Sequence, residues 1–327
     1  MEPDRYEGLL CPTDFSAFSA DALRHALAIA QRFGTRLTVL HVIPHGFTPG
    51  ESRYGGTRFL LLPEIRKHAE EGMKNFLQPV RDARMDHMVE LREGDPSREI
   101  LACANDGRVD LVVMGARGAS GFERLVLGSV AEKVVHRVAC DVLTVGHEEG
   151  RTWDAPGLIS RIVCGVDFSQ ASNVAVGRAA DFARAFGAAM TLVHVIESVP
   201  YLAGDIFGGF IEPEAMRKSL TDAAETGLKE LLADPRLAGL KVESRVVTAA
   251  SAAPSLVEAA VSGNADLLVV GAQGHGAVER FLFGSTSRQV IRRATCPVLS
   301  VRPKKAKDED GAKVSGGLAL APTPKRD

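Results

Sequence analysis

Short apolar runs alternate along the chain with longer segments in which apolar residues recur every three or four positions. Buried strands are indicated in the second half by "RIVCGV", "MTLVHV", "DLLVV" and "PVLSV", and a further strand by the alternating "KVESRVV". Helical spacing is found in "SNVAVGRAADFARAFG", in residues 212–233, in "SLVEAAVSG" and in "STSRQVIRRA". The first of these helices is expected to end at Gly187. Alternating strands and helices predict an α/β fold with a doubly wound parallel sheet.

The same order of segments occurs twice. "LLCPTDFSAFS" from Leu9 matches "IVCGVDFSQAS" from Ile162, "LTVLHVI" matches "MTLVHVI", and "VDLVVMGARG" matches "ADLLVVGAQG". We therefore predict two tandem domains, residues 1–147 and 161–302. A polar linker with Gly and Pro is expected at residues 148–160. The charged, Gly- and Pro-rich segment 303–327 is expected to be a disordered tail.

A glycine motif follows the fourth predicted strand of each half and precedes a helix. It reads Gly-x2-Gly-x9-Gly-Ser, at Gly115, Gly118, Gly128 and Ser129, and again at Gly271, Gly274, Gly284 and Ser285. A helix N-terminus exposes unpaired N–H groups and partial positive charge, and glycine lets the backbone approach a ligand. The motif therefore predicts an anion site of the kind that holds phosphate. It is not a Walker A loop, because the required lysine is missing.

Plainer interpretations of these residues remain open. Ser129 with Glu132 forms a capping-box pattern, so the serine could simply cap a helix. From one copy of the motif alone, a simple turn and a ligand site would be about equally good interpretations. The second copy, with the same glycines and serine at the same spacing, favours a ligand site. His41 and His194 close the second strand of each half, where packing is a more common role than catalysis.

Asp14 and Asp167 end the first predicted strand of each half. Each could cap the following helix. Ligands of doubly wound sheets bind beyond the carboxyl ends of the strands, where the strand order reverses. If the first and fourth strands meet there, each aspartate faces the glycine motif and could hold ribose hydroxyls, or a phosphate-bound metal through water.

Four segments, matched in order and twice, resemble the universal stress protein family: "PTDFS", "HVI", the glycine motif, and the following "VAEKVVHRVACDVLTV". The resemblance covers nearly all of residues 5–146 and 159–302. It implies five-stranded parallel sheets of strand order 3-2-1-4-5, a Rossmann-like arrangement of the adenine nucleotide alpha hydrolase type. It also implies ATP as the ligand, with any Mg²⁺ held by the phosphates.

The resemblance further implies which residues meet the nucleotide. The aspartates would lie near the ribose, the backbone of Val42 and Val195 would meet the adenine, and the glycine motif would hold ribose and phosphates. The expected set is Pro12, Asp14, Val42, Gly115, Arg117, Gly118, Gly128, Ser129 and Val130 in the first half, and Gly165, Asp167, Val195, Gly271, Gln273, Gly274, Gly284, Ser285 and Thr286 in the second. Because Pro12 stands where the second half has Gly165, the two sites are expected to differ at the first strand.

Composition and charge limit the kinds of partner that the chain is expected to bind. A net charge of −2 gives no general electrostatic reason to bind nucleic acid or anionic membranes, and no apolar run approaches the length of a membrane span. The N-terminus lacks the features of a signal peptide, and the five cysteines lack metal-ligand spacing, so we expect a cytoplasmic location with cysteines in the core.

The expected function is that of an ATP-binding, nucleotide-dependent stress-response regulator with two sites per chain and no catalytic residues. A slow ATPase and a partner-binding scaffold with empty pockets are the alternatives. The resemblance also implies that the last strand of each half makes a contact, either in a homodimer or between the two halves of one chain. The protein partner is not identified.

Overall fold

Ten strands join in one continuous sheet in the computed structural model of the chain, which describes residues 6–44, 57–118, 127–146, 159–197, 213–273 and 283–303. Five strands come from the first half: β1 (Gly8–Thr13), β2 (Arg36–Pro44), β3 (His87–Gly94), β4 (Leu111–Gly115) and β5 (Asp141–Val145). Five come from the second half: β6 (Arg161–Val166), β7 (Ala189–Glu197), β8 (Val242–Ala249), β9 (Leu267–Gly271) and β10 (Val298–Val301).

The strand order across the sheet is β3-β2-β1-β4-β5-β10-β9-β6-β7-β8. Within each half the paired strands are parallel, and each half has the expected order 3-2-1-4-5. The α/β fold with doubly wound parallel strands is therefore confirmed. The order reverses between β1 and β4, and again between β6 and β9.

The two halves meet through their last strands. β5 and β10 pair antiparallel, with Val142 opposite Ser300, Leu143 opposite Leu299 and Thr144 opposite Val298. The Thr144 hydroxyl also donates to the Val298 carbonyl oxygen at 3.3 Å. Two five-stranded sheets with a contact through their last strands were expected; in this structure the contact lies between the two halves of the chain and merges the sheets into one. Each last strand thus finds a hydrogen-bonding partner for its outer edge within the same chain.

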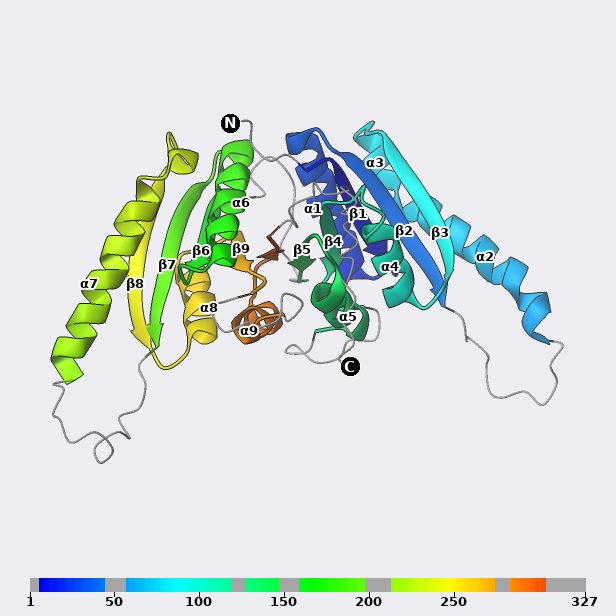
Figure 1. Cartoon of the computed structure of the whole chain (residues 1–327). Coiled ribbons are helices and arrows are strands. Elements are labelled where there is room, and N and C mark those ends of the chain that lie inside the picture. The colour runs from blue at the N-terminus through cyan, green and yellow to red at the C-terminus, as the bar shows by residue number, and fades with distance from the viewer. Residues whose placement is uncertain are drawn as a thin grey trace, which may run out of the picture.

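Helices cover both faces of the sheet (Figure 1). The helices are α1 (Ala17–Phe33), α2 (Thr57–Phe76), α3 (Gln78–Asp82), α4 (Pro96–Ala104), α5 (Ser129–Arg137), α6 (Gln170–Phe186), α7 (Pro213–Leu232), α8 (Ala252–Ser262) and α9 (Ser285–Arg293). One core lies under α1, α2, α6 and α7, and the second lies under α4, α5, α8 and α9. The near-continuous apolar strands follow from this, because helices bury both faces.

The caps of α1 and α6 show how the repeated sequence defines helix ends. Ser16 and Ser169 accept hydrogen bonds from the backbone N–H groups three residues ahead, as N-cap serines do. Gly34 and Gly187 adopt the left-handed conformation, with φ of 67° and 70°, and close the helices. The predicted helix end at Gly187 is confirmed.

The first core crosses between the halves. Phe33 of α1 and Phe182 of α6 lie with ring centroids 5.2 Å apart, and Tyr6 lies edge-on to both. Ile159, which we placed in the linker, is buried in this core. Ser160 is also described and is exposed, whereas residues 148–158 of the predicted linker and residues 304–327 of the predicted tail lie outside the described residues. In the part of the chain that the structure describes, no helix is long and apolar enough to cross a membrane.

Candidate functional site

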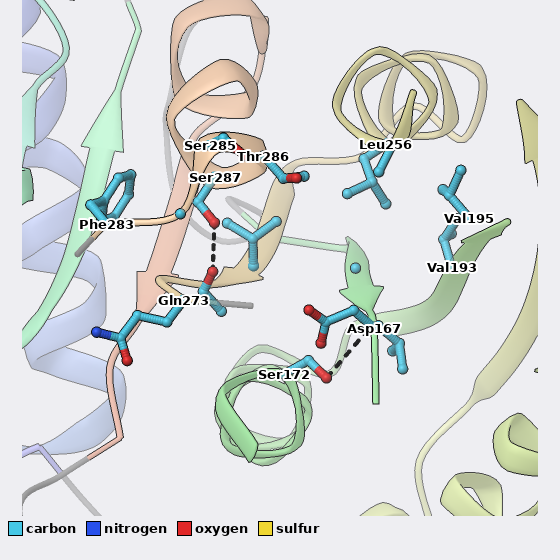
Figure 2. A pocket seen from close by; sticks show the side chains of 16 residues that line it. Asp167, Ser172, Val193, Val195, Leu256, Gln273, Phe283, Ser285, Thr286 and Ser287 are labelled. Carbon is cyan, nitrogen blue, oxygen red and sulfur yellow. Dashed lines mark hydrogen bonds between the residues drawn. The ribbon is translucent and has the colours of Figure 1, made fainter. Parts of the chain in front are cut away.

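A cavity of about 410 Å³ lies in the second half, where the strand order reverses between β6 and β9. This is the position at which doubly wound sheets bind ligands. Figure 2 shows its lining side chains around the carboxyl ends of the strands. The cavity is lined by Gly165, Val166, Asp167, Ser172, Val193, Val195, Ala252, Leu256, Val270, Gly271, Gln273, Phe283, Gly284, Ser285, Thr286 and Ser287.

The glycine motif is closed by one backbone hydrogen bond. The N–H of Gly128 donates to the Ala116 carbonyl oxygen at 2.8 Å, and the N–H of Gly284 donates to the Ala272 carbonyl oxygen at the same distance. The chain therefore leaves the strand end after the first glycine and returns to it at the third. The two ends of the motif are held together in both halves, which explains why its spacing is repeated.

The helix after the motif begins without a side-chain cap. The N-cap residues of α5 and α9 are Gly128 and Gly284, and no side chain accepts a hydrogen bond there. The alternative in which Ser129 caps the helix is wrong: Ser129 is already the first helical residue, and the cap position belongs to glycine. A glycine cap leaves the first N–H groups of the helix without a competing side chain, which suits an anionic ligand.

The strand-end aspartates do not cap the helices. The carboxylate Oδ1 of Asp14 accepts hydrogen bonds from the Ser16 N–H at 3.1 Å and from its hydroxyl at 2.6 Å. Oδ1 of Asp167 accepts from the Ser169 N–H at 2.9 Å. Each aspartate thus orients the serine that does cap the helix. Asp167 also lines the cavity, facing the first turn of α9 (Figure 2).

The turn after each aspartate is strained in the same way. Phe15 and Phe168 have φ of 64° and 60°, in the left-handed region that disfavours side chains. Their rings stack on His41 and His194, with centroids 4.3 and 4.6 Å apart. Strain of this kind persists only when packing compensates for it, and it collects near functional sites.

The two histidines have structural roles. Nδ1–H of His41 donates to the Thr13 carbonyl oxygen at 2.8 Å, and Nδ1–H of His194 donates to that of Val166 at 2.8 Å. These bonds join the ends of neighbouring strands, β2 to β1 and β7 to β6, at the residue that directly precedes each aspartate. Both histidines pack against a ring and hydrogen-bond at the strand ends, which is the role that the sequence favoured.

Apolar side chains form part of the cavity wall. Val193, Val195, Leu256 and Val270 line it. A Cβ at Gly165 would lie 3.0 Å from Leu256 Cδ1, so glycine leaves space there. In the first half this position is Pro12, which is buried. The two sites thus differ at this strand, as the sequence indicated.

The structure brings most of the predicted second-half residues to the cavity: Gly165, Asp167, Val195, Gly271, Gln273, Gly284, Ser285 and Thr286. Gly274 lies outside the described residues. In the first half, Gly118 lies against Asp14, and Gly128 lies against Arg117. Val42 is buried, while Ser129 is exposed and Val130 half-buried at the start of α5.

Eight lining residues were not predicted: Val166, Ser172, Val193, Ala252, Leu256, Val270, Phe283 and Ser287. Two of them had a signal in the sequence. Val193 lies two positions before Val195, so both side chains face the same side of β7. Phe283 directly precedes the last glycine of the motif. Leu256 had none, because the packing of α8 against the sheet brings it in.

Titratable groups near the sites are few. Within the described ranges, no group of three or more His, Cys, Asp or Glu side chains is arranged to hold a metal ion. Burial raises the pKa of the Cys11 and Cys164 thiols to about 12, which keeps them protonated. Cys103 and Cys296 are also buried, and Cys140 is half-buried, so the cysteines pack in the core as expected.

Comparison with known proteins agrees with this geometry. The family model described as the universal stress protein family matches residues 5–146 and 159–302. A universal stress protein of Mycolicibacterium smegmatis is 30% identical over 307 residues, which cover 91% of this chain and 97% of that protein. One from Methanocaldococcus jannaschii is 33% identical over 143 residues, 43% of this chain and 82% of the relative.

A solved structure shares the fold over almost the whole length. The crystal structure of a universal stress protein from Archaeoglobus fulgidus aligns with a TM-score of 0.62 and 24% identity, covering 90% of this chain and 98% of that one. The duplicated strand order, the twice-matched family model and the full-length relative point the same way. The chain therefore belongs to the universal stress protein family.

Proposed function

We propose that the chain binds adenine nucleotide, with ATP as the principal ligand, at one site in each half and acts as a nucleotide-dependent stress-response regulator. The observation that carries the proposal is the cavity between β6 and β9, which combines an uncapped helix N-terminus, a carboxylate and an apolar wall. Its volume of about 410 Å³ lies in the range of roughly 300–1,000 Å³ typical of small-molecule sites.

The phosphate end of the ligand fits the first turn of α9. Ser285 and Thr286, the first residues of α9, supply backbone N–H groups at the positive end of the helix dipole. The Thr286 side chain lies at the cavity in the same turn (Figure 2). Ser287 donates its hydroxyl to the Gly271 carbonyl oxygen at 2.6 Å and so ties the helix to the end of β9.

The nucleoside end fits the opposite side. A carboxylate accepts hydrogen bonds from hydroxyl groups, which suits Asp167 to the ribose. Val193, Val195 and Leu256 offer an apolar surface for a flat base. Asp167 is the acidic residue among those that line the cavity, so a single carboxylate is available to a metal ion there. Any Mg²⁺ would therefore be held mainly by the phosphates and would bind as part of the ligand.

The first half supports a second site through the same parts. Its strand-end Asp14, its closed glycine motif and its glycine-capped α5 repeat those of the second half. Arg117 replaces Gln273 and Pro12 replaces Gly165, so the two sites are not identical. We expect both to bind the same class of ligand with different affinities.

Acid release and chromatography of nucleotide from the purified protein, followed by calorimetry with ATP, test the proposal. We expect about two nucleotides per chain, one at each helix N-terminus. Turnover should stay well below the roughly 1 per second at the lower end of ordinary enzymes. Steady hydrolysis at that rate or above, lost on mutation of a glycine motif, would favour the ATPase, and no binding at all would favour a scaffold with empty pockets.

A further inference from the structure

One residue of the second site reaches into the first half of the chain. Phe283 directly precedes Gly284, the N-cap of α9, and lines the cavity. Its side chain is 7% exposed and points away from Asp167, toward the first half (Figure 2). The residue that precedes the N-terminus of α9 is therefore held by the other half of the chain.

The ring of Phe283 is held by α5. His136, in the last turn of that helix, lies with its ring centroid 5.2 Å from that of Phe283, at an interplanar angle of 40°. The guanidinium of Arg302 lies 5.8 Å from the Phe283 centroid. Arg302 also donates to the carbonyl oxygens of Val135 and His136 at 2.7 and 3.3 Å, which fixes the end of α5 beside the ring.

A second contact joins the same two helices. Arg292 of α9 donates to Glu132 of α5 at 2.9 Å. Both partners are about two-fifths exposed, so this pair contributes little stability by itself. It restrains α9 near its end, whereas the Phe283–His136 contact restrains the residue just before its beginning.

We propose that Phe283 is a positioning residue and that the second nucleotide site is completed by the first half of the chain through His136. The aromatic contact holds the backbone of residues 283–285, so the N–H groups of the α9 N-terminus point into the cavity. The binding test of this proposal rests on the proposed function, because it measures nucleotide affinity. A second test, by hydrogen exchange, needs no nucleotide.

The arrangement is one-sided. The repeat places Leu127 where the second half has Phe283, and Arg292 where the first half has His136. The first site thus has no aromatic pair at the matching position. We expect substitutions at His136 to affect the second site and to leave the first unchanged.

The binding test uses the full chain carrying Gly118→Val, which disables the first site, so that calorimetry with ATP reads the second. His136→Ala should weaken binding by about 2- to 10-fold, the range typical of an aromatic pair. His136→Phe keeps a ring and should bind like the parent. Arg137→Ala removes an exposed neighbour on the same helix and serves as the control. Equal affinities in all these proteins, or equal weakening by alanine and phenylalanine, would overturn the proposal.

Hydrogen exchange tests the anchoring on its own. Without nucleotide, the amides of residues 283–287 should exchange several-fold faster in His136→Ala than in His136→Phe, and Phe283→Leu should match the alanine variant. If the Gly118→Val protein binds no nucleotide, the proposed function fails at the second site, and the exchange comparison decides the role of Phe283. Identical exchange in the alanine and phenylalanine variants refutes it.

Discussion

The carboxylate of Asp14 lies against the backbone of Gly118, so that a Cβ on residue 118 would come within 2.6 Å of Asp14 Oδ2. Glycine at this position therefore lets the Asp14 carboxylate keep its place beside the motif. Gly118 does not have a left-handed φ, so conformational freedom is not the reason for glycine here. The close approach brings the two features of the proposed first site into one contact.

Gly118→Val should remove the first nucleotide site and leave the fold intact. The clash involves the free end of the Asp14 side chain, which can swing aside, and that movement takes the carboxylate away from the ligand. Calorimetry should show a fall from about two nucleotides per chain to about one, since one helix N-terminus remains usable. The melting temperature should stay close to that of the parent.

Gly146→Val is the matched control for this variant. A Cβ on Gly146 would meet nothing within 4 Å, and its φ is not left-handed. The control should keep both nucleotides. If Gly118→Val also keeps both, the contact with Asp14 has no part in ligand binding.

Gly115→Ala should lower the free energy of unfolding. A Cβ there would lie 2.9 Å from Phe18 Cβ and 3.0 Å from both the Phe18 carbonyl carbon and the Arg117 carbonyl oxygen. Backbone atoms cannot move aside as a side-chain end can, so α1 and β4 must separate. We expect a loss of about 1–3 kcal/mol, the usual effect of overpacking.

Thermal unfolding of Gly115→Ala and of the equivalent Gly271→Ala measures this effect. At Gly271 the close atoms are the carbonyl carbon of Ala171 and the N of Ser172, at 2.9 and 3.0 Å. Both variants should melt several degrees below the parent. Parent-like melting in both would show that helix and strand can adjust, and that the first glycine of the motif has another purpose.

Much of this organisation could be predicted from the sequence because it depends on local pattern. Apolar runs and helical spacing predicted a doubly wound parallel sheet, and the duplicated motif placed the site at the carboxyl ends of the strands. The strand order was implied by the resemblance to the universal stress protein family. The resemblance implied a contact through the last strands. The choice between pairing within one chain and pairing between two chains could not be predicted, because a strand's apolar pattern does not specify its neighbour on the outer edge. The pattern of Ser129 and Glu132 left a capping box open as an alternative, and only the structure shows that Gly128 takes the cap position.

Contacts between the halves were also beyond prediction, because the repeat does not contain them. Asp141 accepts hydrogen bonds from the Tyr6 hydroxyl at 2.9 Å, from Arg178 Nε at 3.2 Å and from the Arg302 N–H at 2.8 Å. The matching position in the second half is Pro297, so no second copy pointed to this cluster.

Arg178→Ala should therefore be strongly destabilising. Asp141 and Arg178 are only 4% and 5% exposed, and Arg178 lies 4.7 Å from the Tyr6 ring centroid. Removing the guanidinium leaves a buried carboxylate without its cation, which typically costs about 3–5 kcal/mol. Denaturant unfolding should show this loss.

Arg217→Ala provides the comparison for an exposed ion pair. The Arg217 side chain is 64% exposed and pairs with Glu214 at 3.7 Å on the surface of α7. Its loss should cost less than about 1 kcal/mol. Similar effects of the two substitutions would contradict a special role for the buried cluster.

The pH dependence of stability should carry a contribution from His136. Burial, together with the positive charge of Arg288, lowers the pKa of His136 from its ordinary 6.5. Below about pH 6.5 the unfolded chain then binds a proton at this position more readily than the folded chain does. This contribution to stability is complete above that pH, and it is lost as the pH falls toward the lower pKa of the folded state.

His136→Phe removes the titrating group and keeps a ring against Phe283. Melting temperatures of the parent and the variant, measured between about pH 5 and pH 8, should run parallel at the upper end, and the parent should fall more steeply below about 6.5. Parallel curves over the whole range would show that folding leaves the pKa of His136 unchanged.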